Sequence, residues 1–168
     1  MEIISTEDYT LYIAAIPAMP RGSRREAERA AVATLLGAAV PGAELCHDDA
    51  GAPFLQGGGD THISVSHSRG YAVLAVSQHR IGVDMEEYAR KTQLERVSAR
   101  FVRPDDNLSI GSLLAAWTAK EAVFKAAGLR DAVLADIRLT DAETAALGGR
   151  RFSLKFHEFD DALIALAL

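Results

Sequence analysis

One segment, "LLAAWTAKEAVFKAAG", constrains the fold more than any other part of the chain. It predicts a helix over about residues 111–127, and Gly128 directly after it suits the left-handed residue that commonly ends a helix. The helix is apolar on most sides, and Trp117 and Phe124 fall on the stripe that should face the core. The fold is therefore expected to bury this helix against other elements.

The remaining segments predict strands and helices in two successive halves. Strands are expected at residues 9–16, at two segments within 61–77, and at 80–87, 132–139, 151–159 and 161–168. The glycine-rich residues 51–60 are expected to form a loop. S-x-x-E or T-x-x-E capping boxes should open three helices, at Ser23 with Glu26, Thr92 with Glu95, and Thr140 with Glu143. The fold class is thus α+β, with halves 1–79 and 80–168 packed as one unit.

Composition narrows the class of protein. The chain has 168 residues, 49% hydrophobic and 24% charged, which is enough to bury roughly 70% of the unfolded surface. Its apolar runs are shorter than the ~18 residues of a membrane span, and its N-terminus is acidic rather than signal-like, so we expect a cytoplasmic protein. The single cysteine, Cys46, excludes an internal disulfide and a multi-cysteine metal site.

Charge is unevenly distributed along the chain. The net charge of −5 argues against nucleic-acid binding, which needs an excess of Lys and Arg on one face. Despite this negative net charge, the sequence contains two basic clusters. They are Arg21, Arg24, Arg25 and Arg29, and then Arg90, Lys91, Arg96, Arg100 and Arg103. A small polyanion or an acidic protein could bind them, although solvated helix faces explain such clusters equally well.

The strand "IGVDME" carries two carboxylates on one face. Side chains alternate along a strand, so Asp84 and Glu86 share a face with Gly82 and stand about 7 Å apart. Acidic residues on a solvated strand face are ordinary, which is the simpler explanation. Gly82 beside them would allow another backbone or a ligand to approach closely.

A third carboxylate, Glu121, falls on the apolar stripe of the long helix. An ionised group there costs several kcal/mol unless it is paired, so Glu121 should be protonated, salt-bridged or metal-bound. Lys125, four residues later, could be its partner. Alternatively, Glu121 joins Asp84 and Glu86 around a hard cation, with Lys120 and Lys125 near phosphate oxygens, which is how proteins often bind magnesium.

The segment "SVSHS" ends a strand at a turn. There the hydroxyl of Ser66, the imidazole of His67 and backbone N–H groups could hold an anion. A hairpin turn with self-bonded serines is the simpler alternative.

Taken in order, "SVSHS", "IGVDME" and "WTAKEAVFKAAG" resemble the S-H-S, G-[IV]-D-x-E and W-[ST]-x-K-E-[AS]-x-x-K motifs of the 4′-phosphopantetheinyl transferases. The resemblance is to the single-chain, surfactin-activator-like class, which activates carrier proteins of fatty-acid, polyketide and nonribosomal-peptide synthesis. It covers about residues 20–130, and the last two motifs together are highly specific. It implies a pseudo-dimer of two similar α+β halves, with the active site in the cleft between them and the chain acting as a monomer.

The resemblance implies coenzyme A as substrate and magnesium, with manganese as an alternative, as cofactor. By motif position, the metal ligands are Asp84, Glu86 and Glu121, the phosphate contacts are Lys120 and Lys125, and the 3′-phosphate contacts are Ser66, His67 and Arg29. In this family the serine hydroxyl of an apo carrier protein attacks the β-phosphate of coenzyme A, which leaves 3′,5′-ADP. Glu121 would then accept the serine proton, and Lys125 would protonate the departing phosphate. The basic residues of the second cluster become a candidate docking surface for an acidic carrier protein.

The chain departs from the family pattern in two ways. It is short for the single-chain class, and Gly51, Ala52 and Pro53 stand where the family commonly has G-K-P, so one expected cation is missing. Arg24, Arg25 or Arg29 could replace it. Two alternative functions stay open: a non-catalytic module that binds coenzyme A or a carrier protein, and a magnesium-dependent hydrolase of nucleotide pyrophosphates.

Overall fold

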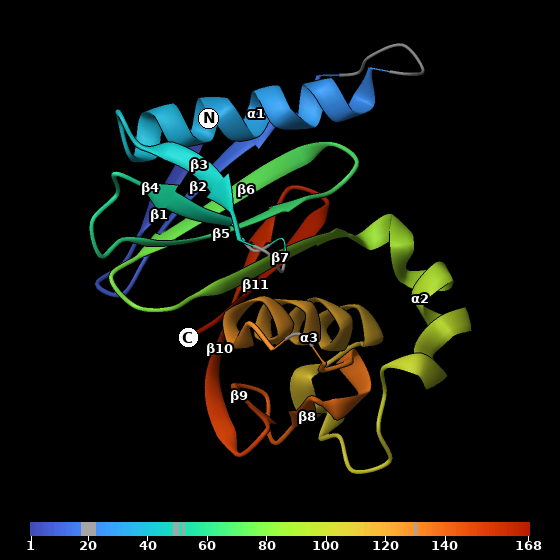
Figure 1. Cartoon of the computed structure of the whole chain (residues 1–168). Helices are drawn as coiled ribbons and strands as arrows, with labels where there is room; N and C mark the ends of the chain where they lie inside the picture. Colours follow the sequence, from blue (N-terminus) through green and yellow to red (C-terminus); the bar gives the residue numbers. More distant parts are fainter. Residues whose placement is uncertain (18–22, 49–50, 52, 130) are drawn as a thin grey trace. The chain divides into compact units, whose positions relative to one another are not determined.

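The computed structural model describes residues 1–17, 23–48, 51, 53–129 and 131–168. Arg21 of the first basic cluster and Ala52, which stands where the related family commonly has lysine, lie outside these residues. The chain divides into two compact units, Met1–Ile81 and Gly82–Leu168 (Figure 1). No helix in the described part of the chain is long and apolar enough to cross a membrane.

The first unit is built on a four-stranded antiparallel sheet with the order β1-β2-β6-β5. Its strands are β1 (Glu2–Ser5), β2 (Thr10–Ala15), β5 (His62–His67) and β6 (Tyr71–Ser77). Helix α1 (Arg24–Ala39) covers one face of this sheet (Figure 1). A separate antiparallel hairpin consists of β3 (Glu44–His47) and β4 (Pro53–Gln56).

Helix α1 packs on its sheet through an apolar stripe. Ala27, Ala31 and Leu35 follow one another at four-residue intervals, which places them on one face of the helix. This face is buried against Ile63 of β5 and Leu74 of β6. The core of the first unit therefore lies between α1 and these strands.

The second unit contains a five-stranded antiparallel sheet with the order β7-β11-β10-β9-β8. Its strands are β7 (Gly82–Glu87), β8 (Arg138–Leu139), β9 (Thr144–Leu147), β10 (Arg150–Phe159) and β11 (Ala162–Ala167). Its α-helices are α2 (Lys91–Val97) and α3 (Leu113–Ala127). Short 3₁₀ turns occur at Tyr88–Arg90, Ser98–Arg100, Leu108–Ile110 and Leu134–Asp136.

Helix α3 lies unusually close to β7. A Cβ atom on Gly82 would stand 2.0 Å from the carbonyl oxygen of Ala122 and 2.6 Å from the backbone nitrogen of Ala126. Only glycine fits at this position. This agrees with the prediction that Gly82 would allow another backbone to approach the strand closely. Gly82 therefore lets α3 lie directly on the strand that carries the two carboxylates.

The α+β class and most of the long elements are confirmed. The helix expected at residues 111–127 is α3, which begins after Ser112, whose side chain accepts from the backbone of Ala115. Gly128 ends it in the left-handed conformation with φ 61°. The expected strands at residues 9–16, 61–77, 80–87 and 151–168 correspond to β2, β5, β6, β7, β10 and β11.

Several local predictions are wrong. Ser23 precedes α1, but its side chain makes no capping hydrogen bond, and Thr92 lies inside α2 rather than at its start. Thr140 and Glu143 open no helix; they lie in the turn before β9, where Thr140 N–H donates to the carbonyl of Thr144. Residues 51–60 include β4, and residues 132–139 form a 3₁₀ turn followed by a two-residue strand.

Candidate active site

Strand β7 directs two buried carboxylates at α3. Asp84 is 6% exposed and Glu86 7% exposed, so the simpler explanation of a solvated strand face is wrong. Both residues contact side chains of α3, on the same side of the strand as Gly82. A buried pair of carboxylates needs cationic or hydrogen-bonding partners, and α3 supplies some of them.

Lys125 is the cationic partner of Asp84. Its Nζ atom lies 2.9 Å from Asp84 Oδ1 and donates a second hydrogen bond of 2.9 Å to the carbonyl of Val83. The lysine thus holds the end of α3 against β7. Its ion pair is with Asp84, whereas the sequence also allowed a pair with Glu121.

Glu86 is held by two donors. The indole N–H of Trp117 donates to Glu86 Oε1 at 3.1 Å, and the guanidinium of Arg90 donates to the same oxygen. Burial raises the pKa of Glu86, and the negative charge of Asp84 raises it further, whereas the hydrogen bond from Arg90 lowers it. The hydrogen bonds from Arg90 and Trp117 therefore stabilise the charged form of this carboxylate against the effect of burial.

Glu121 completes the group from the middle of α3. It is half-buried, and burial raises its pKa. Asp84 and Glu86 raise this pKa further by charge repulsion, whereas Lys125 lowers it. The three carboxylates thus act electrostatically on one another, which is the relationship expected of ligands that share a cation.

The chemistry of this donor set fits a hard divalent ion, since three carboxylates offer only oxygen ligands. Burial raises the pKa of Glu121 most, and the repulsion by Asp84 and Glu86 that adds to it is what a dication would relieve. As they stand, the described residues contain no group of three or more His, Cys, Asp or Glu arranged to hold a metal ion. One oxygen of each carboxylate on β7 already has donors: Lys125 donates to Asp84 Oδ1, and Arg90 and Trp117 both donate to Glu86 Oε1.

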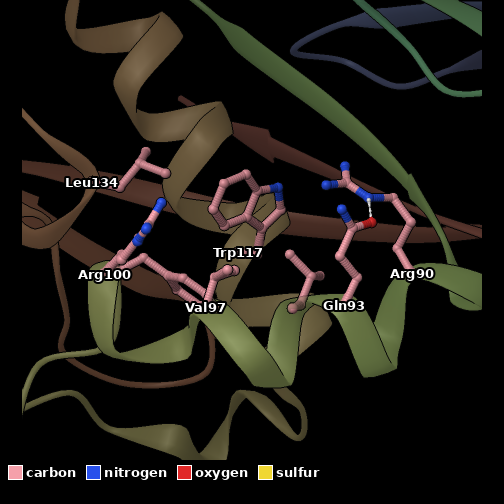
Figure 2. Close-up of a pocket in the computed structure, with 8 residues that line it drawn as sticks. Arg90, Gln93, Val97, Arg100, Trp117 and Leu134 are labelled. Carbon is pink, nitrogen blue, oxygen red and sulfur yellow. Dashed lines mark hydrogen bonds between the residues drawn. The ribbon is translucent and has the colours of Figure 1, made fainter.

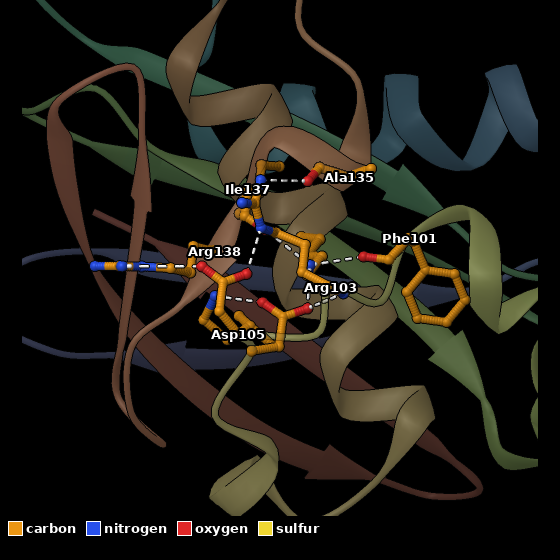
Figure 3. Close-up of polar contacts among 9 residues, drawn as sticks. Phe101, Arg103, Asp105, Ala135, Ile137 and Arg138 are labelled. Atoms are coloured by element: carbon orange, nitrogen blue, oxygen red, sulfur yellow. Dashed lines mark hydrogen bonds and ion pairs between the residues drawn. The ribbon is translucent and has the colours of Figure 1, made fainter.

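The side chain of Lys120 does not point toward the carboxylates of β7. Its side chain has no exposure, and its Nζ donates to Asp106 Oδ2 at 2.6 Å and to the carbonyls of Phe101 and Ile137 at 2.7 Å each (Figure 3). An ammonium group has three N–H donors, so these contacts use all of them. The structure therefore does not bring Lys120 to the carboxylates of β7, and it differs here from the expected phosphate contact.

The candidate anion-binding residues of the first unit are only partly brought together. Ser66 is buried and His67 is exposed, because neighbouring residues of β5 face opposite sides of the sheet. His67 Nδ1 lies 3.7 Å from the carboxylate of Glu28 on α1. Arg29 lies on the exposed part of the same helix.

Glu28 is a residue that the sequence analysis missed. Its Oε1 accepts from Arg24 Nε at 2.7 Å, and Arg24 also donates to the carbonyl of Ser68 at 3.4 Å. The hydrogen bond from Arg24 lowers the pKa of Glu28, and the charges of His67 and Arg25 contribute to the lowering. The four-residue spacing of Arg24 and Glu28 was the one signal in the sequence, since such pairs meet on a helix face.

A cavity of about 380 Å³ lies between α2 and α3 (Figure 2). Its lining is largely apolar and also includes polar side chains. The lining residues are Arg90, Gln93, Leu94, Val97, Arg100, Phe101, Trp117 and Leu134. Phe101 packs edge-on against Trp117, with ring centroids 5.1 Å apart. The Arg90 guanidinium carbon lies 6.0 Å from the Trp117 ring centroid. Trp117 thus contacts Glu86 of the carboxylate group and also lines the cavity.

Comparison with known proteins assigns the second unit. A family model described as the 4′-phosphopantetheinyl transferase superfamily matches residues 80–166, which is just over half of the chain. The matched region contains Asp84, Glu86, Glu121 and Lys125, together with the cavity beside Trp117. No curated protein matches the chain. The chain belongs to the 4′-phosphopantetheinyl transferase superfamily.

Proposed function

We propose that the protein transfers the 4′-phosphopantetheine group of coenzyme A to a serine of an apo acyl or peptidyl carrier protein and releases 3′,5′-ADP. The observation that carries this proposal is the pair of buried carboxylates on β7, Asp84 and Glu86, which faces Trp117 and Lys125 of α3. Membership of a transferase superfamily supports the class of reaction. The proposal includes the single-chain class, in which the two units form a pseudo-dimer and one chain is active as a monomer.

The carboxylates would hold the cofactor. Asp84, Glu86 and Glu121 would bind magnesium, or manganese in its place, and the bound ion supplies positive charge that stabilises the pyrophosphate of coenzyme A during transfer. Arg90 and Lys125 now neutralise part of the carboxylate charge. Both side chains are partly exposed, so they can also interact with phosphate oxygens from the solvent side.

Two residues of α3 would act as the general base and the general acid. Glu121 is half-buried and its pKa is raised, which suits a carboxylate that accepts the proton of the attacking serine hydroxyl. The Lys125 ammonium lies beside Asp84 and can protonate the departing phosphate of 3′,5′-ADP. Lys120 is not included among the phosphate contacts, because its three donors are bound inside the fold.

The first unit would contribute the 3′-phosphate contacts of coenzyme A. His67 and Arg29 are both exposed, so their side chains can donate hydrogen bonds to such a phosphate. Ser66 lies on the buried side of β5, so we assign it a structural role in the strand. Arg24 also lies near His67 through Glu28, which makes it a candidate to replace the cation that is missing at position 52 of the sequence.

Helix α2 would dock the carrier protein. Lys91, Arg96 and Arg100 are exposed along this helix and the 3₁₀ turn after it. The apolar cavity beside Trp117 lies next to them and could accept an apolar side chain of the partner. Basic residues around an apolar depression suit an acidic, amphipathic helix of a carrier protein.

Intact-protein mass spectrometry tests the proposal directly. An apo acyl carrier protein incubated with coenzyme A, magnesium and this protein should gain the mass of one phosphopantetheine group. Glu121→Ala should abolish the gain, whereas Glu143→Ala, at an exposed glutamate of the same unit, should leave it intact. Binding of coenzyme A without a mass gain on any carrier would favour a binding module, and 3′,5′-ADP release without a carrier would favour a hydrolase.

A further inference from the structure

The Asp106 carboxylate joins three segments of the second unit. Its Oδ2 accepts from Lys120 of α3 and from the backbone N–H of Arg103 at 2.8 Å. Its Oδ1 accepts from the backbone N–H of Leu139 in β8 at 2.8 Å. The side chains of Asp106 and Lys120 both have zero exposure, so the ion pair lies inside the fold. Lys120 is therefore attached to the segment before α3 and to the sheet after it.

Other contacts stiffen this attachment. The backbone N–H of Asn107 donates to the carbonyl of Leu139 at 2.9 Å, and Arg103 Nη1 donates to the carbonyl of Ala135 at 3.0 Å. Figure 3 shows the polar contacts that gather around Phe101, Arg103 and Ile137. The two segments that supply the acceptors of Lys120 are thus held to each other by hydrogen bonds of their own.

A second side of α3 is attached to β7. Trp117, Glu121 and Lys125 follow at four-residue intervals and form one stripe on the helix. Trp117 bonds to Glu86 and Lys125 to Asp84. Successive residues leave a helix about 100° apart, so Lys120 and Glu121 point in different directions from neighbouring positions. Two attachments on different sides of one helix fix its rotation about its own axis.

We propose that Asp106 is a positioning residue, which holds Lys120 and so fixes the rotation of α3 that directs Glu121 at Asp84 and Glu86. This assignment rests on the proposed function, in which the three carboxylates bind a divalent ion. Lys120 then serves the site from inside the fold instead of contacting phosphate. Directional hydrogen bonds suit this role, since an apolar pair of similar volume would stabilise the core without fixing one orientation.

The test compares Asp106→Asn with Asp105→Asn. The first change places an amide N–H₂ where the carboxylate accepts hydrogen bonds. The second alters a neighbouring carboxylate that is 48% exposed and pairs with Arg103 at the surface. Trp117 is the only tryptophan of the chain, so its fluorescence reports on the contact between α3 and β7 without any label. Binding of aqueous Mn²⁺, followed by electron paramagnetic resonance, reports on the carboxylates.

Asp106→Asn is expected to weaken Mn²⁺ binding at least fivefold and to change the acrylamide quenching of Trp117 at least 1.5-fold in the folded protein. Asp105→Asn should match the unmodified chain in both. A residue that only stabilises the fold would lower the unfolding midpoint and leave the native fluorescence and Mn²⁺ affinity unchanged. A folded Asp106→Asn variant with both values unaltered would overturn the proposal.

Asp106→Glu provides a second test in case Asp106→Asn does not fold. It keeps the charge but lengthens the side chain by one methylene, so it should shift both readouts in the same direction by a smaller factor. Unaltered readouts in a folded Asp106→Glu variant would also overturn the assignment. Neither readout requires transfer to a carrier protein. A failure of the transferase proposal would appear as absent carrier modification by the unmodified chain, with the Mn²⁺ and fluorescence comparisons still informative.

Discussion

Trp117 of α3 donates its indole N–H to the buried carboxylate of Glu86 on β7, at 3.1 Å. This bond connects the helix that carries Glu121 and Lys125 to the strand that carries Asp84. The same indole ring lines the cavity beside α2 and packs edge-on against Phe101. One tryptophan therefore supports both the carboxylate group and the proposed docking surface.

Replacing Trp117 by phenylalanine should destabilise the chain by about 1.5–3 kcal/mol, because it removes a hydrogen bond to a buried charged group. Arg90 still donates to Glu86, so the carboxylate is not left without a donor. Urea unfolding followed by far-ultraviolet circular dichroism measures the change without relying on tryptophan emission. Phe54→Leu, at a position 47% exposed, should shift stability by less than about 0.5 kcal/mol. Equal effects of the two changes would contradict the importance of the bond to Glu86.

Gly82→Ala should cost about 3 kcal/mol or more, because the new Cβ meets backbone atoms of α3 that cannot turn aside as a side chain would. The nearest is the carbonyl oxygen of Ala122, at 2.0 Å. Gly37→Ala is the matched control: it lies inside α1 with no atom within 4 Å of the added Cβ. It should stabilise the chain by about 0.5–1 kcal/mol, since alanine favours helix more than glycine does. Thermal unfolding of both variants checks the opposite signs.

His157 on β10 should make stability depend on pH. Burial lowers its pKa, so the unfolded chain takes up the proton first as pH falls. The contribution of the neutral imidazole is therefore fully present above the ordinary histidine pKa of about 6.5 and declines below it. Between pH 7.5 and 5.5, the unmodified chain should lose more stability than His157→Gln. Parallel curves for His157→Gln and the unmodified chain would contradict this.

The sequence predicts α3 and β7 because their signals are local. An apolar helix that ends at Gly128 and a strand that alternates around Asp84 need no knowledge of distant residues. The same local signals do not predict the hairpin of β3 and β4. Its strands are short, and the second begins at Pro53 in a glycine-rich segment. Local pattern thus recovers long elements and misses short ones.

The candidate site shows a different limit of prediction from sequence. The motif places Lys120 beside Glu121 in sequence, yet the helix turns the two side chains to different environments. The partner of Lys120 is Asp106, in an irregular segment without periodicity, so only the three-dimensional fold reveals it. Glu28 near His67 is a similar case, since α1 and β5 are far apart in sequence.

Charge reversal on α2 tests the docking surface. Arg96 and Arg100 are exposed, whereas Arg90 is held by Glu86, so the first two are the residues to change. Arg96→Glu combined with Arg100→Glu should raise KM for an acidic carrier protein about tenfold, because like charges then face each other across the interface. KM for coenzyme A should stay within twofold, since neither residue belongs to the carboxylate group.

Salt dependence strengthens this test. Screening weakens attraction between exposed charges, so the unmodified chain should lose affinity for the carrier as ionic strength rises, and the double variant should lose less. Arg151→Glu, at an exposed position of β10 in the same unit, is a control for charge reversal away from α2, with half the change in net charge that the double variant makes. It should leave KM for the carrier near that of the unmodified chain. If Arg151→Glu raised KM as much as the α2 variant did, a general charge effect would explain the result, and the docking site would have to be sought outside α2.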